Sequence, residues 1–430
     1  MYKVLCIVDK SLIMIIMRPI FLIFGKGVLY MDTVKKVALA YSGGLDTSII
    51  IPWLKETYNC EVITICTDVG QEEETEGLEE KALKTGASKF YLENLQKELV
   101  EDCIFPMAMI GAKYEGRYLL GTSIARPIQA KRQVEIALKE GCDALAHGCT
   151  GKGNDQVRFE LTYKTLAPQL KVIAPWRIWD LQSREDCIEY AKKHNIDLGG
   201  ISEKKIYSRD RNIWHISHEG GELEDLINRP NENMFVLSKS PKDAPDQETF
   251  VTIGFEKGIP VSIDGKKMDG VSLLKYLNKI GGENGIGRAD ILENRLVGMK
   301  SHGVYETPGG TILYAAYDEL REMVLEKDSM SLLADMGKVY ANMVYNGKYY
   351  THLRMALENF AREMMRFATG EVTLALYKGN CIVAGKKSPY SLYSEEIASF
   401  TTGSLYSHKD SAGFINLFGL QMGIEAKIQK

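Results

Sequence analysis

The sequence feature that most constrains the fold is a strand-to-helix junction at residues 37–48, VALAYSGGLDTS. A short apolar run breaks into a Ser/Gly turn and resumes as an amphipathic segment, which predicts a strand, a tight loop and a helix. Gly43 and Gly44 lack a Cβ, so the backbone there can approach a ligand closely. Loop amides and the positive end of the helix dipole favour an anion at this point. The junction therefore predicts a phosphate-binding loop.

The polar residues of this loop narrow its chemistry. Ser42, Thr47 and Ser48 supply hydroxyl donors, and Asp46 supplies a carboxylate that can hold Mg²⁺ against phosphate oxygens. The loop differs from G-x-x-x-x-G-K-[ST] and from G-x-G-x-x-G. It resembles the pyrophosphate loop of the N-type ATP pyrophosphatases, which split ATP into AMP and pyrophosphate. A Ser-Gly-Gly turn alone is often only a connection, but the added carboxylate and hydroxyls favour the nucleotide interpretation.

A second Gly-rich segment, HGCTGKGNDQVRFE, occupies residues 147–160 and follows a short strand. It crowds together hydroxyl, amide and charged side chains, namely those of Thr150, Lys152, Asn154, Asp155, Gln156 and Arg158. Groups of both charges with amide hydrogen bonds suit a zwitterionic amino acid better than an apolar ligand. His147 is equally compatible with packing and with acid–base chemistry.

Apolar runs alternating with amphipathic segments predict an α/β first domain, a parallel sheet with helices on both faces. We expect strands at 37–40, 61–68, 89–92 and 144–147, and helices at 78–84 and 131–140. The acidic run 72–74 is expected to be a solvated helix start. Both Gly-rich loops follow strand ends, where ligands bind in such sheets.

The pattern changes after about residue 197. Residues 250–265 and 372–385 have the pattern of hairpins, and 273–280, 317–326 and 353–367 that of helices, which predicts an α+β second domain. The tail from residue 386 is apolar but too short for its own core, so we expect it to dock on another surface. The expected domains are a 1–30 extension, a 31–197 nucleotide-binding domain, a 198–385 second domain and a 386–430 tail.

Composition restricts the possible partners. A net charge of −4 disfavours a protein that covers nucleic-acid phosphates. The eight cysteines form no C-x-x-C pair, so we interpret them as reduced thiols of a cytoplasmic protein.

The first 30 residues are apolar but are interrupted by Arg18 and Pro19. A spanning helix needs roughly 20 mostly apolar residues, and no A-x-A-like cleavage site is present. We favour a start codon assigned too far upstream, with Met31 as the ordinary start, over a membrane or targeting segment.

From residue 37 nearly to the C-terminus the chain resembles the argininosuccinate synthase family. The resemblance is carried by the two loops above and by four further blocks: GRYLLGTSIARP at 116–127, IAPWR at 173–177, ENRLVGMKS at 293–301 and YETPGGT at 305–311. It implies that the enzyme joins L-citrulline and L-aspartate at the expense of ATP, giving argininosuccinate, AMP and pyrophosphate through a citrullyl-adenylate, in arginine biosynthesis. It also implies ATP with Mg²⁺, a synthetase and multimerisation role for residues 198–385, and a homotetramer in which the tail packs across subunits. We expect no nucleic-acid or membrane partner.

The resemblance also assigns site residues. The expected ATP contacts are Ala40, Tyr41, Ser42, Gly43, Gly44, Leu45, Asp46, Thr47, Ser48, Thr67 and Gly148, with Asp46, Ser42 and Ser48 as catalytic residues and Asp46 as the metal ligand. The expected citrulline contacts are Tyr118, Ser123, Asn154, Arg158, Ser208, Ser217, Glu293 and Tyr305. Aspartate is expected at Thr150, Asn154 and Asp155. Without the resemblance, each tyrosine could be a packing residue, each serine a loop cap and Arg158 a surface cation.

Two other classes stay open on the residues alone. An RNA-thiolating enzyme would share the loop but would need reactive cysteines and a basic RNA-binding module. A non-catalytic nucleotide sensor would leave the polar block at 293–305 unexplained. No residue is an obvious general base.

Overall fold

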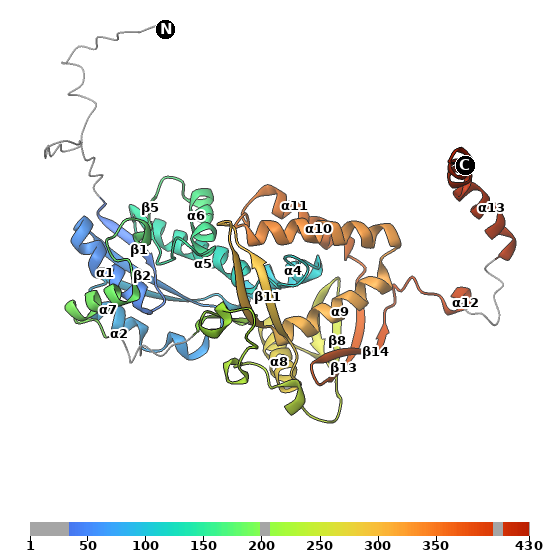
Figure 1. The fold of residues 1–430 in the computed structure, drawn as a ribbon, viewed down its shortest axis with the longest axis horizontal. Helices are drawn as coiled ribbons and strands as arrows, with labels where there is room; N and C mark the ends of the chain where they lie inside the picture. Colours follow the sequence, from blue (N-terminus) through green and yellow to red (C-terminus); the bar gives the residue numbers. More distant parts are fainter. Residues whose placement is uncertain (1–33, 198–206, 399–406, 430) are drawn as a thin grey trace, which may run out of the picture. The chain divides into compact units, whose positions relative to one another are not determined.

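The computed structural model describes residues 34–197, 207–398 and 407–429 (Figure 1). The apolar extension therefore lies outside the described residues. The chain forms two compact units, each assembled from separate stretches. The first holds the described residues up to Leu95, 125–197 and 295–299, and the second holds 96–124, 207–294 and the described residues from Lys300. The linear domain boundaries expected at 197 and 385 stay predictions.

The first unit is built on a parallel sheet with the strand order β3-β2-β1-β4-β5. Its strands are β1 (Lys36–Ala40), β2 (Glu61–Asp68), β3 (Lys89–Asn94), β4 (Ala144–Ala146) and β5 (Lys171–Ile173). Four of them match the predicted strands. The fifth, β5, was not predicted, because a strand of three residues is too short to show a pattern in the sequence.

Helices cover both faces of this sheet, as predicted. They are α1 (Leu45–Tyr58), α2 (Leu78–Lys84), α5 (Gly121–Lys139, in this unit from Ala125), α6 (Asp155–Leu166) and α7 (Arg184–Lys193), with 3₁₀ turns η1 (Glu72–Thr75) and η3 (Pro175–Arg177). Side chains alternate across β1, so Val37 and Leu39 join a core with α1, α2 and α7. Ala38 joins the opposite core with α5 and α6.

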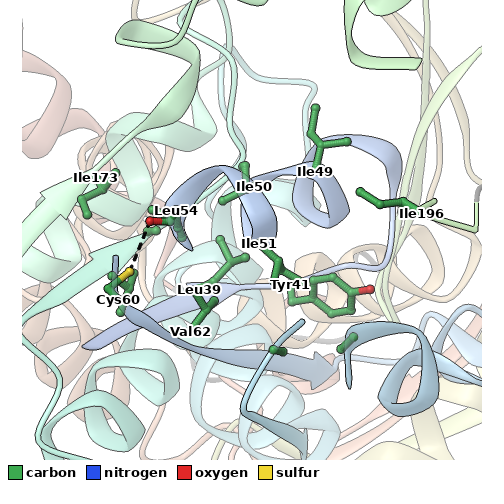
Figure 2. Close-up of a cluster of buried hydrophobic side chains, with 14 of the residues drawn as sticks. Leu39, Tyr41, Ile49, Ile50, Ile51, Leu54, Cys60, Val62, Ile173 and Ile196 are labelled. Carbon is green, nitrogen blue, oxygen red and sulfur yellow. Dashed lines mark hydrogen bonds between the residues drawn. The ribbon is translucent and has the colours of Figure 1, made fainter. Parts of the chain in front are cut away.

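The core under α1 fixes the start of that helix (Figure 2). Ile49, Ile50, Ile51 and Leu54 are fully buried there. A buried aliphatic side chain stabilises the fold by roughly 1.5–3 kcal/mol. The loop before α1 is therefore held by a rigid strand on one side and a tightly packed helix on the other.

The second unit contains two antiparallel sheets. One has the order β10-β9-β8-β13-β14 and the other β11-β12-β7-β6. The strands are β6 (Ser208–Arg211), β7 (Ile216–Glu219), β8 (Thr249–Glu256), β9 (Ile259–Ile263), β10 (Lys266–Lys267), β11 (Arg288–Asn294), β12 (Lys300–Glu306), β13 (Gly370–Tyr377) and β14 (Asn380–Lys387). The α+β prediction is confirmed.

Helices complete the second unit. They are α3 (Gln96–Glu98), the π-helical turn Leu99–Ile104, α4 (Phe105–Met109), α8 (Gly270–Glu283), α9 (Pro308–Val324), α10 (Lys327–Tyr345) and α11 (His352–Met364), with 3₁₀ turns Gly221–Glu224, Glu232–Met234 and Pro241–Asp243. Both predicted hairpins are present as β8–β9 and β13–β14. Their turns, Lys257-Gly258 and Lys378-Gly379, have positive φ at both central residues, which matches the twist of the strands.

Several predicted helix limits were wrong. α5 begins ten residues before the predicted start and carries Pro127 inside it, a residue that normally marks a break because it has no N–H. The helix predicted at 317–326 ends at Val324, and Glu326 caps the next helix, α10, by accepting hydrogen bonds from the amides of Asp328 and Ser329. The acidic run lies in η1, a separate 3₁₀ turn before α2.

The tail contains α12 (Glu395–Ala398), α13 (His408–Phe418) and α14 (Leu420–Ile428), which the sequence analysis did not predict. None of the residues in these three helices is buried. Phe418 and Leu417 are more than 70% exposed although both are large and apolar. Among the described residues, no helix combines the length and the apolar character needed to cross a membrane.

Candidate active site

The loop after β1 is closed by its own hydroxyl groups. Thr47 Oγ1 lies 3.2 Å from Ser42 Oγ and accepts a hydrogen bond from the Ser42 amide at 3.3 Å. Ser48 Oγ donates to the Gly43 carbonyl at 3.4 Å, and Lys81 Nζ donates to the same oxygen at 2.6 Å. The helix cap, Gly44, has no side-chain capping bond. The first amides of α1 therefore keep the donor capacity that an anion needs.

Steric constraints explain why two positions of the site, 43 and 148, are occupied by glycine. Gly43 has φ +72°, and a Cβ there would come within 2.2 Å of Leu78 Cδ2. A Cβ on Gly148 would lie 3.0 Å from Thr47 Cγ2. A Cβ at position 43 would have to displace the Leu78 side chain and would sit on a backbone with positive φ, and a Cβ at position 148 would require Thr47 to shift.

A cavity of about 280 Å³ opens beside the loop. Its lining consists of Ala40, Tyr41, Ser42, Gly44, Leu45, Asp46, Thr47, Ile65, Cys66, Thr67, Gln71, Arg126, Gln129, Gln133, His147, Gly148, Cys149, Asp155 and Phe159. Nine of the eleven residues expected to contact ATP are among them. The other two, Gly43 and Ser48, are buried behind the loop, where Ser48 braces the Gly43 carbonyl.

Asp46 is the acidic side chain of the loop that lines the cavity. Burial raises the pKa of this carboxyl, and the nearby charge of Arg184 partly opposes the shift. Among the described residues, no group of three or more His, Cys, Asp or Glu side chains could hold a metal ion. A single carboxylate fits Mg²⁺, which is usually held by one or two carboxylates with phosphate oxygens and water.

The second Gly-rich loop is held by amide side chains. Gln156 Nε2 donates to the carbonyls of Gly151 at 2.7 Å and Gly153 at 3.1 Å. Asn154 is buried, and its Oδ1 accepts a hydrogen bond from the Leu296 amide at 2.9 Å. Thr150 is exposed.

His147 has a structural role in this loop. Its Nδ1 accepts from the Cys149 amide at 3.2 Å, so its Nε2 carries the proton toward Glu160 Oε1 at 3.0 Å. His147 therefore helps to hold the loop, and it also lines the cavity beside residues 42–48.

Asp155 lies between two guanidinium groups. Its Oδ2 accepts from Arg126 Nε at 2.7 Å, and its Oδ1 accepts from Arg158 Nη1 at 2.8 Å. Burial alone would raise the pKa of Asp155, but the two arginines outweigh it and lower the pKa. Arg158 is 3% exposed, so it is not a surface cation. Arg126 was not predicted as a site residue, although it lies in the GRYLLGTSIARP block at 116–127.

In the second unit, one face of the β11-β12-β7-β6 sheet gathers four predicted citrulline residues. Tyr305 pairs with Ser217, and Ser217 pairs with Asp210, two positions from Ser208. Glu293 lies four positions from Ala289, the partner of Tyr305 in β11. Side chains two positions apart, and directly paired ones, share a face of a sheet. Two distant parts of the sequence, 208–217 and 293–305, thus contribute to one surface.

Two phenols hold the Glu293 carboxylate on this face. Tyr345 Oη donates to Oε1 at 2.8 Å and Tyr305 Oη donates to Oε2 at 3.3 Å. Glu293 is 5% exposed, so these bonds offset part of the cost of burying its charge. Tyr345 was missed because it ends α10, a helix that the sequence analysis did not predict.

Two further predicted residues lie in the same unit. The Tyr118 ring lies 4.7 Å from the Tyr305 ring, centroid to centroid, and its hydroxyl accepts from the Thr122 amide at 3.1 Å. Ser123 Oγ is fully buried and has no hydrogen-bond partner among the described residues. A buried hydroxyl without a partner is costly, which favours a ligand contact there. Asn154 and Arg158 belong to the first unit, so each unit carries part of the predicted citrulline set.

A parallel sheet with an anion-binding loop after its first strand, beside a cavity, defines an α/β nucleotide-binding domain. The family model for the N-terminal HUP domain of argininosuccinate synthase matches residues 36–197, and that for the C-terminal domain matches residues 207–425. The chain therefore belongs to the argininosuccinate synthase family.

Individual relatives agree with this assignment. An argininosuccinate synthase of Clostridium botulinum is 58% identical over 93% of this chain and 98% of its own. One from Acetivibrio thermocellus is 59% identical over 93% of this chain and 99% of its own. A solved U34-tRNA thiolase from Methanococcus maripaludis covers 39% of this chain and 60% of its own at 20% identity, but its TM-score of 0.27 is too low to support an argument. The predicted enzyme class, an ATP-dependent citrulline–aspartate ligase of arginine biosynthesis, is confirmed.

Proposed function

We propose that the enzyme activates citrulline as a citrullyl-adenylate in the cavity beside residues 42–48. One observation supports this proposal. The loop, the start of α1 without a side-chain cap, and Asp46 all lie at one cavity. Such a site suits the β- and γ-phosphates of ATP and leaves the α-phosphorus open to attack by a second substrate.

The chemistry requires activation before ligation, because the nitrogen lone pairs of a ureido group feed its carbonyl and make it a poor electrophile. The ureido oxygen attacks the α-phosphorus, a new P–O bond forms, and pyrophosphate leaves with the electrons of the broken bond. The aspartate amine then attacks the ureido carbon, and AMP leaves with the former ureido oxygen. Positioning and stabilisation of the departing charge are the main tasks of the protein.

The residue roles follow from the charges that line the site. Loop amides with the hydroxyls of Ser42 and Thr47 hold pyrophosphate oxygens, and Asp46 holds Mg²⁺. Thr150, Asn154 and Asp155 contact aspartate, with Asp155 also orienting Arg158 through its hydrogen bond. Arg158 binds the citrulline carboxylate, since a guanidinium pairs with a carboxylate in bidentate fashion. Glu293, held by its two phenols, accepts N–H groups of citrulline.

Isotope labelling tests the adenylate. Citrulline labelled with ¹⁸O at the ureido oxygen should give labelled AMP and unlabelled pyrophosphate, and pyrophosphate release should depend on citrulline. Products of ADP and phosphate, or AMP without label, would contradict the proposal.

Replacing Tyr345 by phenylalanine is expected to raise the citrulline KM by about two- to tenfold, the loss of one hydrogen bond of roughly 0.5–1.5 kcal/mol. The KM for ATP should stay unchanged, because the change frees only the Glu293 carboxylate. Steady-state kinetics with each substrate varied in turn measures both. Tyr317→Phe is a matched control, since it also removes a buried hydroxyl, one that donates to the Gly258 carbonyl. Equal effects of the two variants on citrulline would refute a specific role for Tyr345.

The enzyme acts as a homotetramer in the cytoplasm, and its tail packs across subunits. The exposed apolar side chains of α13 and α14 support this role, because contiguous apolar surface of this kind usually marks an interface. Removing residues 386–430 is expected to lower the oligomeric state, as measured by sedimentation equilibrium. A truncated chain that stays tetrameric would contradict the docking role of the tail.

A further inference from the structure

The carbonyl of Gly43 accepts two side-chain hydrogen bonds. Lys81 Nζ on α2 donates to it at 2.6 Å, and Ser48 Oγ on α1 donates to it at 3.4 Å. The bond from Lys81 is charge-assisted, a kind that is roughly twice as strong as a neutral hydrogen bond. Among the described residues, those that line the cavity include neither Lys81 nor Gly43. The ammonium group therefore meets the carbonyl behind the loop, away from the ligand side.

The packing of α2 sets the position of Lys81. Leu78 and Ala82 of this helix are buried in the core that α1 shares. Leu78 covers Gly43 so closely that a Cβ at position 43 would lie 2.2 Å from its Cδ2. Lys81 lies three positions after Leu78, so the two side chains leave the same face of the helix. The half-buried Lys81 side chain is therefore held against the loop by the core of the first unit.

The peptide group that Lys81 holds joins two glycines, and its orientation is not fixed by sterics. Rotating this planar group by half a turn reverses the Gly43 carbonyl and the Gly44 N–H, and changes only ψ of Gly43 and φ of Gly44. Gly44 has φ −67°, which the rotation would make positive. Glycine adopts positive φ about as readily as negative φ. The Gly-Gly sequence therefore leaves both orientations accessible, and the bonds to the carbonyl select one of them.

The selected orientation turns an amide donor toward the cavity. The carbonyl and the N–H of a trans peptide point in opposite directions, so a carbonyl held toward α2 directs the Gly44 N–H away from α2. That N–H donates to Ser42 Oγ across a long 3.5 Å, and both Ser42 and Gly44 line the cavity. A cationic donor on the carbonyl also polarises the peptide group and strengthens its N–H as a donor.

We propose that Lys81 is a positioning residue that keeps the Gly44 N–H directed at the phosphate oxygens of ATP, with Ser48 as the second donor to the same carbonyl. The inference rests on the proposed nucleotide site. Lys81 acts through the peptide group between residues 43 and 44 and does not touch ATP. Its contribution is largest as pyrophosphate leaves, because a donor that is already oriented stabilises developing negative charge without reorganisation.

Lys81→Met tests this role, because it keeps an apolar stem and removes the donor. We expect kcat/KM for ATP to fall about five- to thirtyfold, and the inhibition constant of pyrophosphate to rise by a similar factor. The inhibition constant of AMP and the KM for citrulline should stay unchanged, since the amide faces only the departing phosphates. Lys84→Met is the matched control, because this exposed lysine of α2 donates to Glu80. Equal effects of the two variants, or a Lys81→Met enzyme with normal ATP kinetics, would overturn the proposal.

A double-mutant cycle with Gly44→Ala shows whether Lys81 acts through the peptide group. Alanine keeps the N–H and fits the present backbone, with its Cβ 3.4 Å from Ser42 Oγ. It disfavours the rotated peptide, in which residue 44 would need positive φ. Lys81→Met should therefore reduce kcat/KM for ATP much less in Gly44→Ala than in the unmodified enzyme. An equal loss in both backgrounds would mean that the ammonium group acts by its charge or by touching phosphate, and would overturn the proposal.

Asp46→Asn separates this inference from the nucleotide site itself. If Asp46→Asn and Lys81→Met both leave ATP kinetics and pyrophosphate inhibition unchanged, the proposed site is wrong and the inference falls with it. If Asp46→Asn alone alters them, the site stands and the role of Lys81 is refuted.

Discussion

Replacing Arg158 by leucine is expected to lower kcat/KM for citrulline about ten- to a hundredfold while the KM for ATP changes little. The lost interaction is a charge-assisted bond to a desolvated carboxylate, worth roughly 1.5–3 kcal/mol. Arg158 is 3% exposed and donates to Asp155, so the substitution also removes one of the two cations beside that carboxylate. Arg126 remains as its partner, which limits the damage to the fold.

The measurement is steady-state kinetics with citrulline and ATP varied separately. Arg177→Leu is the control: this more exposed arginine pairs with Glu160, which lies on α6 like Arg158, and its loss should leave citrulline kinetics unchanged. Arg158→Lys keeps the charge but loses the planar fork, and should fall between the two. Unchanged citrulline kinetics together with a collapse of ATP affinity would reverse the role assigned to Arg158.

The strands and helices of the first unit were predictable because short segments of the sequence indicate them. The run 37–48 contains strand, loop and helix start in one segment, and β2 and α2 match the predicted limits residue for residue. Seven of the nine expected ATP contacts that line the cavity lie in this one segment, whereas Thr67 and Gly148 come from other strand ends. The hydroxyl bonds that close the loop join residues of this segment, whereas the Lys81 bond to the Gly43 carbonyl comes from farther along the chain.

The second unit was less predictable because its site is made by strand pairing. Glu293, Tyr305 and Ser217 share a face only through the register of β11, β12 and β7, which no single segment encodes. Glycine at position 303 has a steric reason that becomes visible in the structure, since a Cβ there would lie 2.7 Å from the Tyr305 hydroxyl. The role of Tyr345 depends on a helix end placed beside that sheet.

Hydrogen-bond partners were the least predictable feature of all. Nothing in the sequence signals that Arg126 and Gln129 connect Asp155 to Thr67, because these contacts link α5 to the first residue of α6 and to the end of β2. The arrangement changes the interpretation of Asp155, which the resemblance assigned only to aspartate binding. In the structure it also orients two arginines.

Replacing Asp46 by asparagine is expected to slow adenylate formation by about a hundredfold or more, the usual loss when one preorganised electrostatic group is removed from an active site. Asp46 lines the cavity at the start of α1, where its carboxylate is proposed to hold Mg²⁺ against the departing pyrophosphate. Asparagine keeps the shape and removes the charge, so packing of α1 should persist. The readout is transfer of ¹⁸O from the ureido oxygen to AMP in a single turnover.

The label experiment separates this role from a general weakening of the enzyme. Glu56→Gln removes an acidic charge from the same helix at a position that accepts from Tyr190, and label transfer should proceed at the normal rate. Raising Mg²⁺ should recover part of the rate in Asp46→Asn, because phosphate oxygens and water remain as ligands. If label transfer in Asp46→Asn matches the unmodified enzyme, the metal is organised elsewhere. The loop would then bind phosphate through its amides and hydroxyls alone.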